Sequence, residues 1–379
     1  MALKANTATR RILLAMFIGI TLHSIFSYTH EDYGRVTSLR NMNLHLSWDG
    51  VMDPDQSLSE AALMTQPKAN ATILMLARNS DVDSAVQSVT QLEDKFNRKV
   101  GYPWVFLNEE PFSEEFKRRV GNVISGEAKF GQIPQEHWFQ PDWIDEEKAQ
   151  ASRDEMVSQN IIYGGSVSYR NMCRFNSGFF FRHPLLQEYK WYWRVEPDVQ
   201  FHCHIDYDPF RYMEERNKTY GFTVTLEEYV QTIPTLWAAT KEFIAGHPEH
   251  IPQDNSMSYL SYDNGDSYNL CHFWSNFEIA DMDFWRGEAY MQYFEHLDST
   301  GGFYYERWGD APVHSIAAAL FQSKDKIHFF DDIGYEHPPF THCPQRDGAW
   351  TRGKCGCDPE QSFDDTRWSC LARWERIFG

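Results

Sequence analysis

The chain has 379 residues, a formal net charge of -19 and an aromatic content of 16%. A chain of this length and aromatic content can bury a large core, which argues against a disordered protein. The negative charge argues against a general nucleic-acid binder, because such proteins place Lys and Arg beside phosphates and release counterions. An anionic nucleotide sugar would therefore need arginines and a cation gathered at its binding site.

An apolar run covers residues 12–28 and follows Lys4, Arg10 and Arg11. Its length is close to the lower limit of roughly 17 residues for crossing a bilayer. Because the basic residues precede the run, the positive-inside rule places the rest of the chain in the lumen. The sequence thus predicts a cytoplasmic tail over residues 1–11, a signal-anchor helix over 12–28 and type II topology. A cleaved signal peptide is the alternative, although no small-x-small cleavage site follows Leu22.

Residues 29–67 are polar, contain Pro54 and Pro67 and show no sustained periodicity. This composition predicts a luminal stem, followed by a catalytic domain over residues 68–379. N-glycosylation sequons at Asn70 and Asn217 fit a luminal protein.

Four of the seven cysteines lie close to the C-terminus. An oxidising lumen favours disulfides, and the odd number leaves at least one cysteine without an intramolecular partner. A zinc site built from Cys343, Cys355, Cys357 and Cys370 is the alternative, but only one residue separates Cys355 from Cys357. Paired zinc ligands usually have at least two residues between them.

Apolar runs and helical periodicity alternate in the first part of the predicted catalytic domain. Residues 72–77 predict a buried strand, and residues 82–96 predict a helix with its N-terminal cap at Ser80. Residues 104–107 predict the next strand, and a short helix is expected after Ser113. This alternation predicts an α/β domain with a largely parallel sheet, whose ligands bind beyond the C-terminal ends of the strands.

Residues 191–195 predict another buried strand, which runs directly into Glu196-Pro197-Asp198. Pro197 ends the strand, so two carboxylates lie at a strand end, and oxygen ligands of this kind suit Mg or Mn. An ordinary acidic turn is the alternative. Further along, a strand is predicted over 220–225, helices over 235–245, 288–297 and 312–321, and an irregular tail after them.

Five longer motifs resemble those of the fungal α-1,2-mannosyltransferases of glycosyltransferase family 15. They are YRNMCRFNSG (169–178), YKWYWRVEPDVQF (189–201), YNLCHFWSNFEIADMDFW (268–285), WGDAPVHSIA (308–317) and DDIGYEHPPFTHCP (331–344). The resemblance extends from about residue 68 to the C-terminus. It implies a GT-A type nucleotide-diphospho-sugar transferase fold with a central mixed, mainly parallel sheet. It also implies GDP-mannose as the donor and retention of the anomeric configuration.

The same resemblance implies a metal site for Mn²⁺ at Glu196 and His337. A cation held by one carboxylate and one imidazole would withdraw charge from the departing GDP. Without the resemblance, His337 would be taken for a loop histidine in a proline-containing segment, with no ligand role.

Three residues in these motifs are candidates for catalysis. Glu278 matches the family's candidate nucleophile, and both a covalent intermediate and electrostatic stabilisation of an oxocarbenium-like transition state stay open. Tyr169 is expected beside the reacting centre, and Asp310 is expected to bind an acceptor hydroxyl. The structural alternatives are a buried ion-pair partner for Glu278, core packing for Tyr169 and a helix N-cap for Asp310.

Four residues are candidates for nucleotide binding. Arg78 and Arg194 carry guanidinium groups that engage phosphate in a fork, although either could instead form an ordinary ion pair. Asn79 follows Arg78 in the sequence, and Asp198 belongs to the acidic turn that follows Arg194. Both are expected at the same site.

The sequence therefore predicts a Golgi membrane enzyme that transfers mannose from GDP-mannose to mannose-terminated O-linked or N-linked glycans of glycoproteins, with no nucleic-acid partner. A mannosylphosphate transferase, which would release GMP in place of GDP, is one alternative. A catalytically inactive luminal mannan-binding protein is another, although it would not need Glu196, Glu278 and His337 together. No prediction of the oligomeric state follows from the sequence.

Overall fold

The computed structural model describes residues 60–346 and 348–378. The predicted tail over 1–11, the predicted signal anchor over 12–28 and residues 29–59 of the predicted stem lie outside the described residues. Helix α3 (Glu60–Thr65) lies within the remainder of that stem, and its Leu63 is buried in the core. Among the described residues, no helix is both long enough and apolar enough to cross a bilayer.

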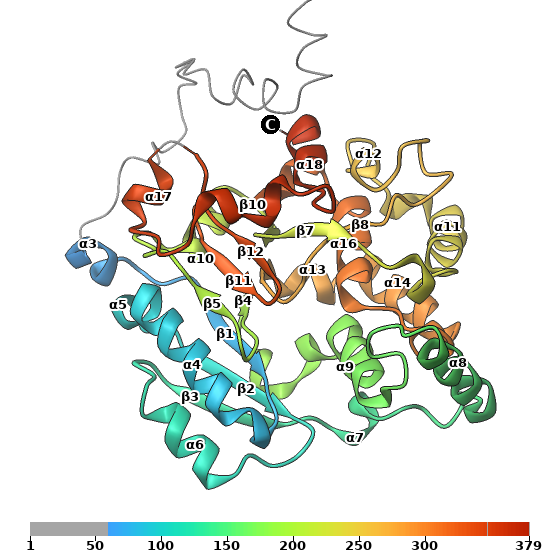
Figure 1. Cartoon of the computed structure of the whole chain (residues 1–379), viewed down its shortest axis with the longest axis horizontal. Helices are drawn as coiled ribbons and strands as arrows, with labels where there is room; N and C mark the ends of the chain where they lie inside the picture. The colour runs from blue at the N-terminus through green and yellow to red at the C-terminus, as the bar shows by residue number, and fades with distance from the viewer. Residues whose placement is uncertain (1–59, 347, 379) are drawn as a thin grey trace, which may run out of the picture. The chain divides into compact units, whose positions relative to one another are not determined.

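A seven-stranded sheet forms the centre of the described residues, in the order β10-β6-β9-β4-β1-β2-β3 (Figure 1). Its strands are β1 (Ala71–Leu76), β2 (Trp104–Asn108), β3 (Ala128–Gln132), β4 (Trp191–Arg194), β6 (Tyr220–Phe222), β9 (Glu278–Asp281) and β10 (Ile327–Phe329). All neighbouring pairs are parallel except those of β9, which runs antiparallel between β4 and β6. The expected mixed, mainly parallel sheet is therefore confirmed, and the predicted strands at 72–77, 104–107 and 191–195 are all part of it.

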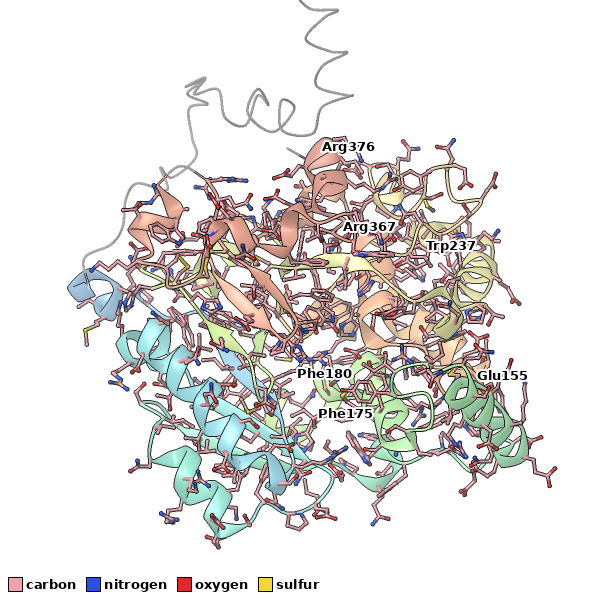
Figure 2. The ribbon with its side chains drawn as sticks, in the orientation of Figure 1. Glu155, Phe175, Phe180, Trp237, Arg367 and Arg376 are labelled. Carbon is pink, nitrogen blue, oxygen red and sulfur yellow. A yellow bond between two sulfur atoms is a disulfide. The ribbon has the colours of Figure 1, made fainter. Side chains whose placement is uncertain are left out.

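Alternating strand residues enter two separate hydrophobic clusters, one on each face of the sheet. In β1, Ile73 and Met75 belong to one cluster and Leu74 to the other, and in β4 Trp193 and Tyr192 divide in the same way. This is the period of two that a strand covered on both faces must show. Figure 2 shows Phe175 and other side chains filling the interior.

Helices cover both faces of the sheet. The cluster with Ile73 also contains residues of α4 (Val82–Leu92), α6 (Glu114–Gly121) and α10 (Pro209–Glu215). The cluster with Leu74 contains residues of α9 (Val167–Gly178), α11 (Leu236–Gly246), α13 (Met282–Arg286), α14 (Glu288–Ser299) and α16 (Asp310–Leu320). The other described α-helices are α5 (Arg98–Val100), α7 (Gln135–Trp138), α8 (Glu146–Ser158), α12 (Met257–Leu260), α15 (Gly302–Tyr305), α17 (Ala349–Arg352) and α18 (Leu371–Phe378).

Three local predictions need correction. Ser80 does not cap α4: it lies inside the 3-10 turn η1 (Asn79–Asp81), and its hydroxyl contacts Asp81. The strand predicted over 220–225 is interrupted, because β6 ends at Phe222 and β7 (Thr225–Glu227) pairs instead with β8 (Cys271–Phe273). The tail is not irregular throughout, since β11 (Tyr335–His337) and β12 (Phe340–His342) form a hairpin that joins β5 (Gln200–Phe201) in a second sheet.

Disulfides tie the C-terminal segment to the rest of the domain. The pairs are Cys203–Cys355, Cys271–Cys370 and Cys343–Cys357. Cys173 is buried and free. The prediction of disulfides is confirmed and the zinc alternative is wrong, because each of the four C-terminal cysteines already has a sulfur partner.

Candidate active site

A cleft of about 660 Å³ opens where β1, β2 and β4 end, at the carboxyl edge of the parallel part of the sheet. This is the edge at which open α/β sheets bind their ligands. Seven of the nine residues predicted for the site line this cleft: Arg78, Tyr169, Arg194, Glu196, Asp198, Asp310 and His337. Glu278 and Asn79 do not line it.

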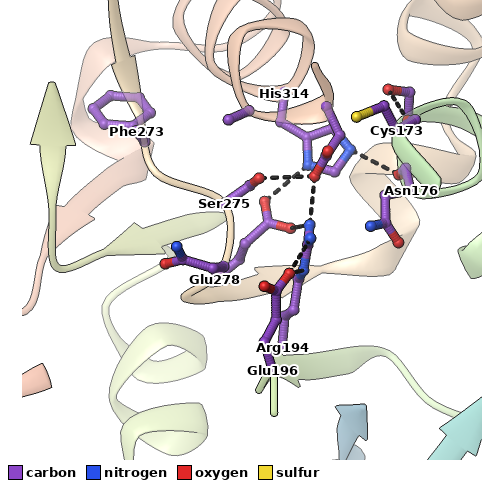
Figure 3. A network of polar contacts seen from close by, with 12 residues as sticks. Cys173, Asn176, Arg194, Glu196, Phe273, Ser275, Glu278 and His314 are labelled. Atoms are coloured by element: carbon purple, nitrogen blue, oxygen red, sulfur yellow. Dashed lines mark hydrogen bonds and ion pairs between the residues drawn. The ribbon is translucent and has the colours of Figure 1, made fainter. Parts of the chain in front are cut away.

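Arg194, the last residue of β4, contacts three carboxylates (Figure 3). Its Nη1 lies 2.5 Å from Asp310 Oδ2 and 3.6 Å from Glu278 Oε1, and its Nη2 lies 2.5 Å from Glu196 Oε1. Burial lowers the pKa of the guanidinium, but the three carboxylates outweigh burial and hold the pKa above its usual range. Glu196 and Asp310 carry two negative charges against the one positive charge of Arg194, so an excess of negative charge remains, which a divalent cation would offset.

Glu196 and His337 each have one side-chain atom available for a cation. Glu196 Oε1 bonds Arg194, so Oε2 faces His337 Nε2 at 3.6 Å. His337 Nδ1 lies 3.1 Å from the Pro338 carbonyl oxygen, which can only accept; Nδ1 therefore carries a hydrogen and Nε2 keeps its lone pair in the neutral ring. A histidine that ligates a metal donates its other N–H in this way. A cation bonded to both atoms at about 2.1 Å would bring them to about 3 Å apart, so the two residues fit a divalent metal after a small adjustment.

The ionisation of these two groups agrees with such a site. Burial raises the pKa of Glu196, but Arg194 and His337 outweigh burial and lower that pKa to about 2. Glu196 is therefore a carboxylate at neutral pH. Burial lowers the pKa of His337, whereas Glu196 raises it above its usual value in the metal-free site. A cation would displace that proton, because metals bind the neutral imidazole.

The hairpin of β11 and β12 brings His337 to Glu196 from far along the chain. Gln200, which follows the acidic turn in β5, pairs with Glu336 of β11, so that turn and hairpin lie side by side. The ring of Trp274 packs edge-on against His337 with 4.9 Å between the centroids, and restricts how the imidazole can turn.

Glu278 lies below the floor of the cleft. It is directly opposite Arg194 in the antiparallel pairing of β4 with β9, and its side chain has no exposed surface. Its Oε2 lies 2.8 Å from His314 Nδ1, and its Oε1 has no hydrogen-bond partner among the described residues. The candidate nucleophile is thus held behind Arg194 and does not touch the cleft.

Asp310 opens α16 and has its carboxylate in the cleft wall. Its Oδ2 accepts hydrogen bonds from Arg194 and from Ser275 Oγ, the latter at 2.8 Å. The N-cap of α16 is Gly309, so the alternative reading of Asp310 as an N-cap is wrong.

Tyr169 stacks on Tyr163 at the cleft, with 4.5 Å between ring centroids and 11° between ring planes. Burial raises the pKa of Tyr169, so its hydroxyl stays protonated. The guanidinium of Arg307 lies 5.1 Å from the centroid of the same ring, and Arg307 is only 3% exposed. Its buried Nε has no hydrogen-bond partner among residues 60–346 and 348–378, so Arg307 brings a positive charge with an unused donor to the cleft.

The predicted nucleotide-binding residues are placed differently from one another. Arg78 is about half exposed; its Nη2 lies 2.5 Å from Ser168 Oγ and its Nε 3.6 Å from a Glu109 oxygen. Asp198 is exposed at the cleft with φ of +66°, a left-handed conformation that Asp tolerates better than most residues. The amide of Asn79 is instead bonded to the backbone of the loop before α6: its Nδ2 donates to the Pro111 carbonyl oxygen, and its Oδ1 accepts from the Ser113 N–H.

His314, Ser275 and Arg307 belong to the site although the sequence patterns did not single them out. His314 lies four residues after Asp310, and that spacing places both side chains on one face of a helix, so a signal was present in WGDAPVHSIA. Ser275 and Arg307 carry no local signal, since only the fold brings them to the cleft.

The chain matches the family model described as glycolipid 2-alpha-mannosyltransferase over residues 31–378. Glycolipid 2-alpha-mannosyltransferase 2 of Candida albicans is 54% identical over 312 residues, which are 82% of this chain and 68% of the relative. Alpha-1,2 mannosyltransferase KTR1 of Saccharomyces cerevisiae is 53% identical over 313 residues, which are 83% of this chain and 80% of the relative.

Two solved structures are similar over the same part of the chain. Core-mannan synthase A of Aspergillus fumigatus in its Mn/GDP form has a TM-score of 0.78 and 44% identity, covering 82% of this chain and 86% of that one. The mannosyltransferase Ktr4p of Saccharomyces cerevisiae in complex with GDP has a TM-score of 0.78 and 44% identity, covering 82% of each chain. The fold is accordingly of the GT-A type, and these two relatives were solved with Mn and GDP and with GDP, respectively. The chain belongs to the glycolipid 2-alpha-mannosyltransferase family, glycosyltransferase family 15.

Proposed function

We propose that this protein transfers mannose from GDP-mannose to a mannose-terminated glycan, with Mn²⁺ as cofactor, and forms an α-1,2 linkage with retention of configuration. The observation that carries the proposal is the convergence of Glu196, His337, Arg194 and Asp310 in one cleft at the strand ends. The Mn/GDP form of core-mannan synthase A and the GDP complex of Ktr4p support the choice of metal and donor.

Glu196 and His337 would hold the metal, because each presents one free ligand atom to the other across a short gap. A divalent cation at this point supplies Lewis-acid stabilisation of negative charge on the diphosphate. Arg78 and Arg307 add positive charge at the cleft, where a guanidinium can bind phosphate or sugar oxygens in a fork.

Asp310 is proposed to bind the acceptor hydroxyl. Its Oδ2 is occupied by Arg194 and Ser275, whereas its Oδ1 accepts no hydrogen bond from the described residues. A free carboxylate oxygen at a cleft wall can accept from a sugar hydroxyl and orient it for attack. The stacked Tyr163 and Tyr169 provide an aromatic surface for the sugar ring beside it.

Glu278 is proposed to stabilise positive charge on the transferred sugar without bonding to it. Covalent attack needs a carboxylate oxygen at the cleft surface, and Glu278 is fully buried with Arg194 in front of it. The burial supports a front-face route to retention, in which the leaving phosphate takes the proton of the acceptor hydroxyl and the buried carboxylate acts through space.

We also propose that the protein is a single-pass type II protein of the Golgi membrane, anchored by residues 12–28. Three disulfides and the exposed sequon residues Asn70 and Asn217 support a luminal catalytic domain.

The full-length protein incubated with GDP-mannose, Mn²⁺ and a panel of α-mannosides tests the function. We expect GDP release, and a product whose new linkage is α-1,2 by methylation analysis and by the anomeric proton signal in NMR. Release of GMP with a phosphodiester product would identify a mannosylphosphate transferase instead. Glycan binding without any nucleotide release would identify a binding protein, and a β-linked product would rule out retention.

A further inference from the structure

We propose that His314 is a positioning residue that shares one buried proton with Glu278 and so keeps this carboxylate oriented and anionic beneath the cleft. The inference rests on the proposed mannosyl transfer, and it adds to that reaction a residue whose side chain does not touch the cleft. Figure 3 shows His314 between Glu278 and Asn176.

The hydrogen-bond geometry determines where the hydrogens of His314 lie. Its Nε2 lies 3.1 Å from the backbone carbonyl oxygen of Asn176, and its Nδ1 lies 2.8 Å from Glu278 Oε2. A carbonyl oxygen can only accept, so Nε2 must carry a hydrogen. A neutral ring with its hydrogen on Nε2 would turn the lone pair of Nδ1 toward the carboxylate.

A hydrogen must therefore lie between Nδ1 of His314 and Oε2 of Glu278. In one form the ring is an imidazolium that donates to a carboxylate, and in the other a carboxylic acid donates to a neutral ring. Both forms hold the same single proton, and both are neutral overall. A third form, with a neutral ring and an ionised carboxylate, would bring two lone pairs face to face in a buried place and is energetically unfavourable.

The surroundings of the pair favour the ionic form. Both side chains are fully buried, and the indole of Trp285 stacks on the imidazole with 4.3 Å between centroids and 22° between planes. An aromatic face stabilises a cation above it, and Arg194 on the other side of Glu278 stabilises the anion. The titratable groups that face the pair are Arg194 and Tyr192 from β4, Tyr220 from β6, Tyr290 from α14 and Asp310 from α16.

This arrangement explains how Glu278 can act on a sugar that it does not touch. Held by His314 at Oε2, the carboxylate keeps Oε1 toward Arg194 and the cleft floor. From beneath the cleft, the anion would stabilise the positive charge that the sugar carbon gains when the bond to GDP breaks. Without His314 nothing would hold Oε2, so the carboxylate would turn away and the stabilisation would be lost.

Two substitutions of His314 separate its two hydrogen bonds. In His314→Asn the amide nitrogen takes the place of Nδ1 and still donates to Glu278, whereas in His314→Gln it takes the place of Nε2 and keeps only the bond to Asn176. We expect His314→Gln to lower kcat by about 10- to 100-fold, as loss of a group that orients an active-site ligand does. We expect His314→Asn to keep more of kcat than His314→Gln. Neither should raise the KM for GDP-mannose by more than about twofold, since neither removes a contact that binds substrate and transition state equally.

His183→Gln is the matched control. His183 is also buried, its ring nitrogens contact the backbone of Gln132 and Leu185, and it does not line the cleft. It should lower stability without changing kcat. Wild-type kcat in both folded His314 variants, or an equal loss in both with a raised KM for donor, would overturn the proposal.

Neutron diffraction from the wild-type protein tests the shared proton even if the variants fail to fold. We expect one hydrogen on His314 Nε2 and one between Nδ1 and Glu278 Oε2. An Nε2 without hydrogen, or no hydrogen between Nδ1 and Oε2, would overturn the proposal. If the wild-type protein transfers no mannose, the proposed function fails, and the neutron result still decides whether the proton is shared.

Discussion

The capacity of the cleft to bind a metal comes from individual side-chain atoms that are not already used in hydrogen bonds. Glu196 keeps one oxygen free because Arg194 occupies the other, and His337 keeps one nitrogen free because the Pro338 carbonyl occupies the other. Each free atom would be a poorly satisfied group in an ordinary core, and together they would supply two protein ligands to a divalent metal.

Removing either metal ligand should abolish Mn-stimulated transfer without unfolding the protein. We expect Glu196→Ala and His337→Ala each to lower kcat/KM by at least about 100-fold, the order that loss of an electrostatic stabiliser produces. The fold should survive, because Arg194 still has Asp310 and Glu278 as ionic partners after Glu196 is removed. Initial rates at varied Mn²⁺, and Mn²⁺ binding followed by EPR in the presence of GDP, would measure both effects.

Glu336→Gln is the control for this pair. Glu336 precedes His337 in β11 and its carboxylate also pairs with a histidine, His202 at 3.0 Å, but it does not line the cleft. It should leave Mn²⁺ dependence unchanged. Full Mn-stimulated activity in either alanine variant would remove that residue from the metal site.

The hairpin of β11 and β12 is the element on which the metal site depends, and a buried ion pair supports it. His342 in β12 has its Nδ1 2.6 Å from Asp364 Oδ2 in the 3-10 turn η9 (Phe363–Asp365). Burial lowers the pKa of His342, but Asp364 outweighs burial and the pKa lies above its usual value. The pair therefore joins the hairpin to the C-terminal segment most strongly when His342 is charged.

This pair should make the stability of the protein depend on pH. Because the folded-state pKa of His342 is raised, its contribution is complete below the unfolded value of about 6.5 and is lost as pH rises through the folded-state value. We expect His342→Gln to lower the free energy of unfolding by about 1–3 kcal/mol at pH 6, and by less at pH 8.5. Urea unfolding of both proteins across this range would measure the difference.

His183→Gln should show the opposite trend, because burial lowers the pKa of His183. The contribution of the neutral His183 is present above pH of about 6.5 and falls as the solution becomes more acidic.

A difference between His342→Gln and wild type that grows with pH would show that the Asp364 pair does not hold the proton.

At the level of the molecule, cross-links between distant segments hold the C-terminal tail against the sheet. Cys203 lies just after β5 and bonds Cys355 across 152 residues, whereas Cys271 bonds Cys370 across 99 residues. The first bridge lies next to Gly334, just before β11, the strand that ends with His337, and the second joins β8 to the residue before α18.

Removing the first bridge should weaken metal binding as well as stability. The double variant Cys203→Ser/Cys355→Ser should lose about 2–5 kcal/mol of unfolding free energy, as expected when a long loop is no longer closed. It should also need more Mn²⁺ for half-maximal rate, because the hairpin that carries His337 is less restrained. Cys271→Ser/Cys370→Ser should lose similar stability with an unchanged Mn²⁺ requirement, and an equal Mn²⁺ requirement in both double variants would contradict the role of the first bridge.

Local patterns in the sequence account for β1, β2, β4 and part of β6, and the family resemblance accounts for most of the predicted cleft residues. The apolar runs that predict β1, β2 and β4 are confirmed, because strands buried on both faces are apolar without interruption. The turn after β4 is correct as well, since a proline ends the strand and leaves Glu196 and Asp198 at its end. The Ser80 cap is wrong, because the 3-10 turn η1 precedes α4 and the N-cap of α4 is Asp81, one residue after Ser80.

The rest depends on contacts between segments that are distant in sequence. Nothing near Glu278 reveals that β9 inserts antiparallel beside β4, yet that pairing sets Glu278 behind Arg194 and beside His314. The amino-acid order alone established the strand and helix alternation, the family motifs and the types of residue that could bind a metal, because these follow from neighbours along the chain. Folding in three dimensions settled which carboxylate faces the cleft and which is buried, since burial depends on which surfaces of the whole domain cover one another.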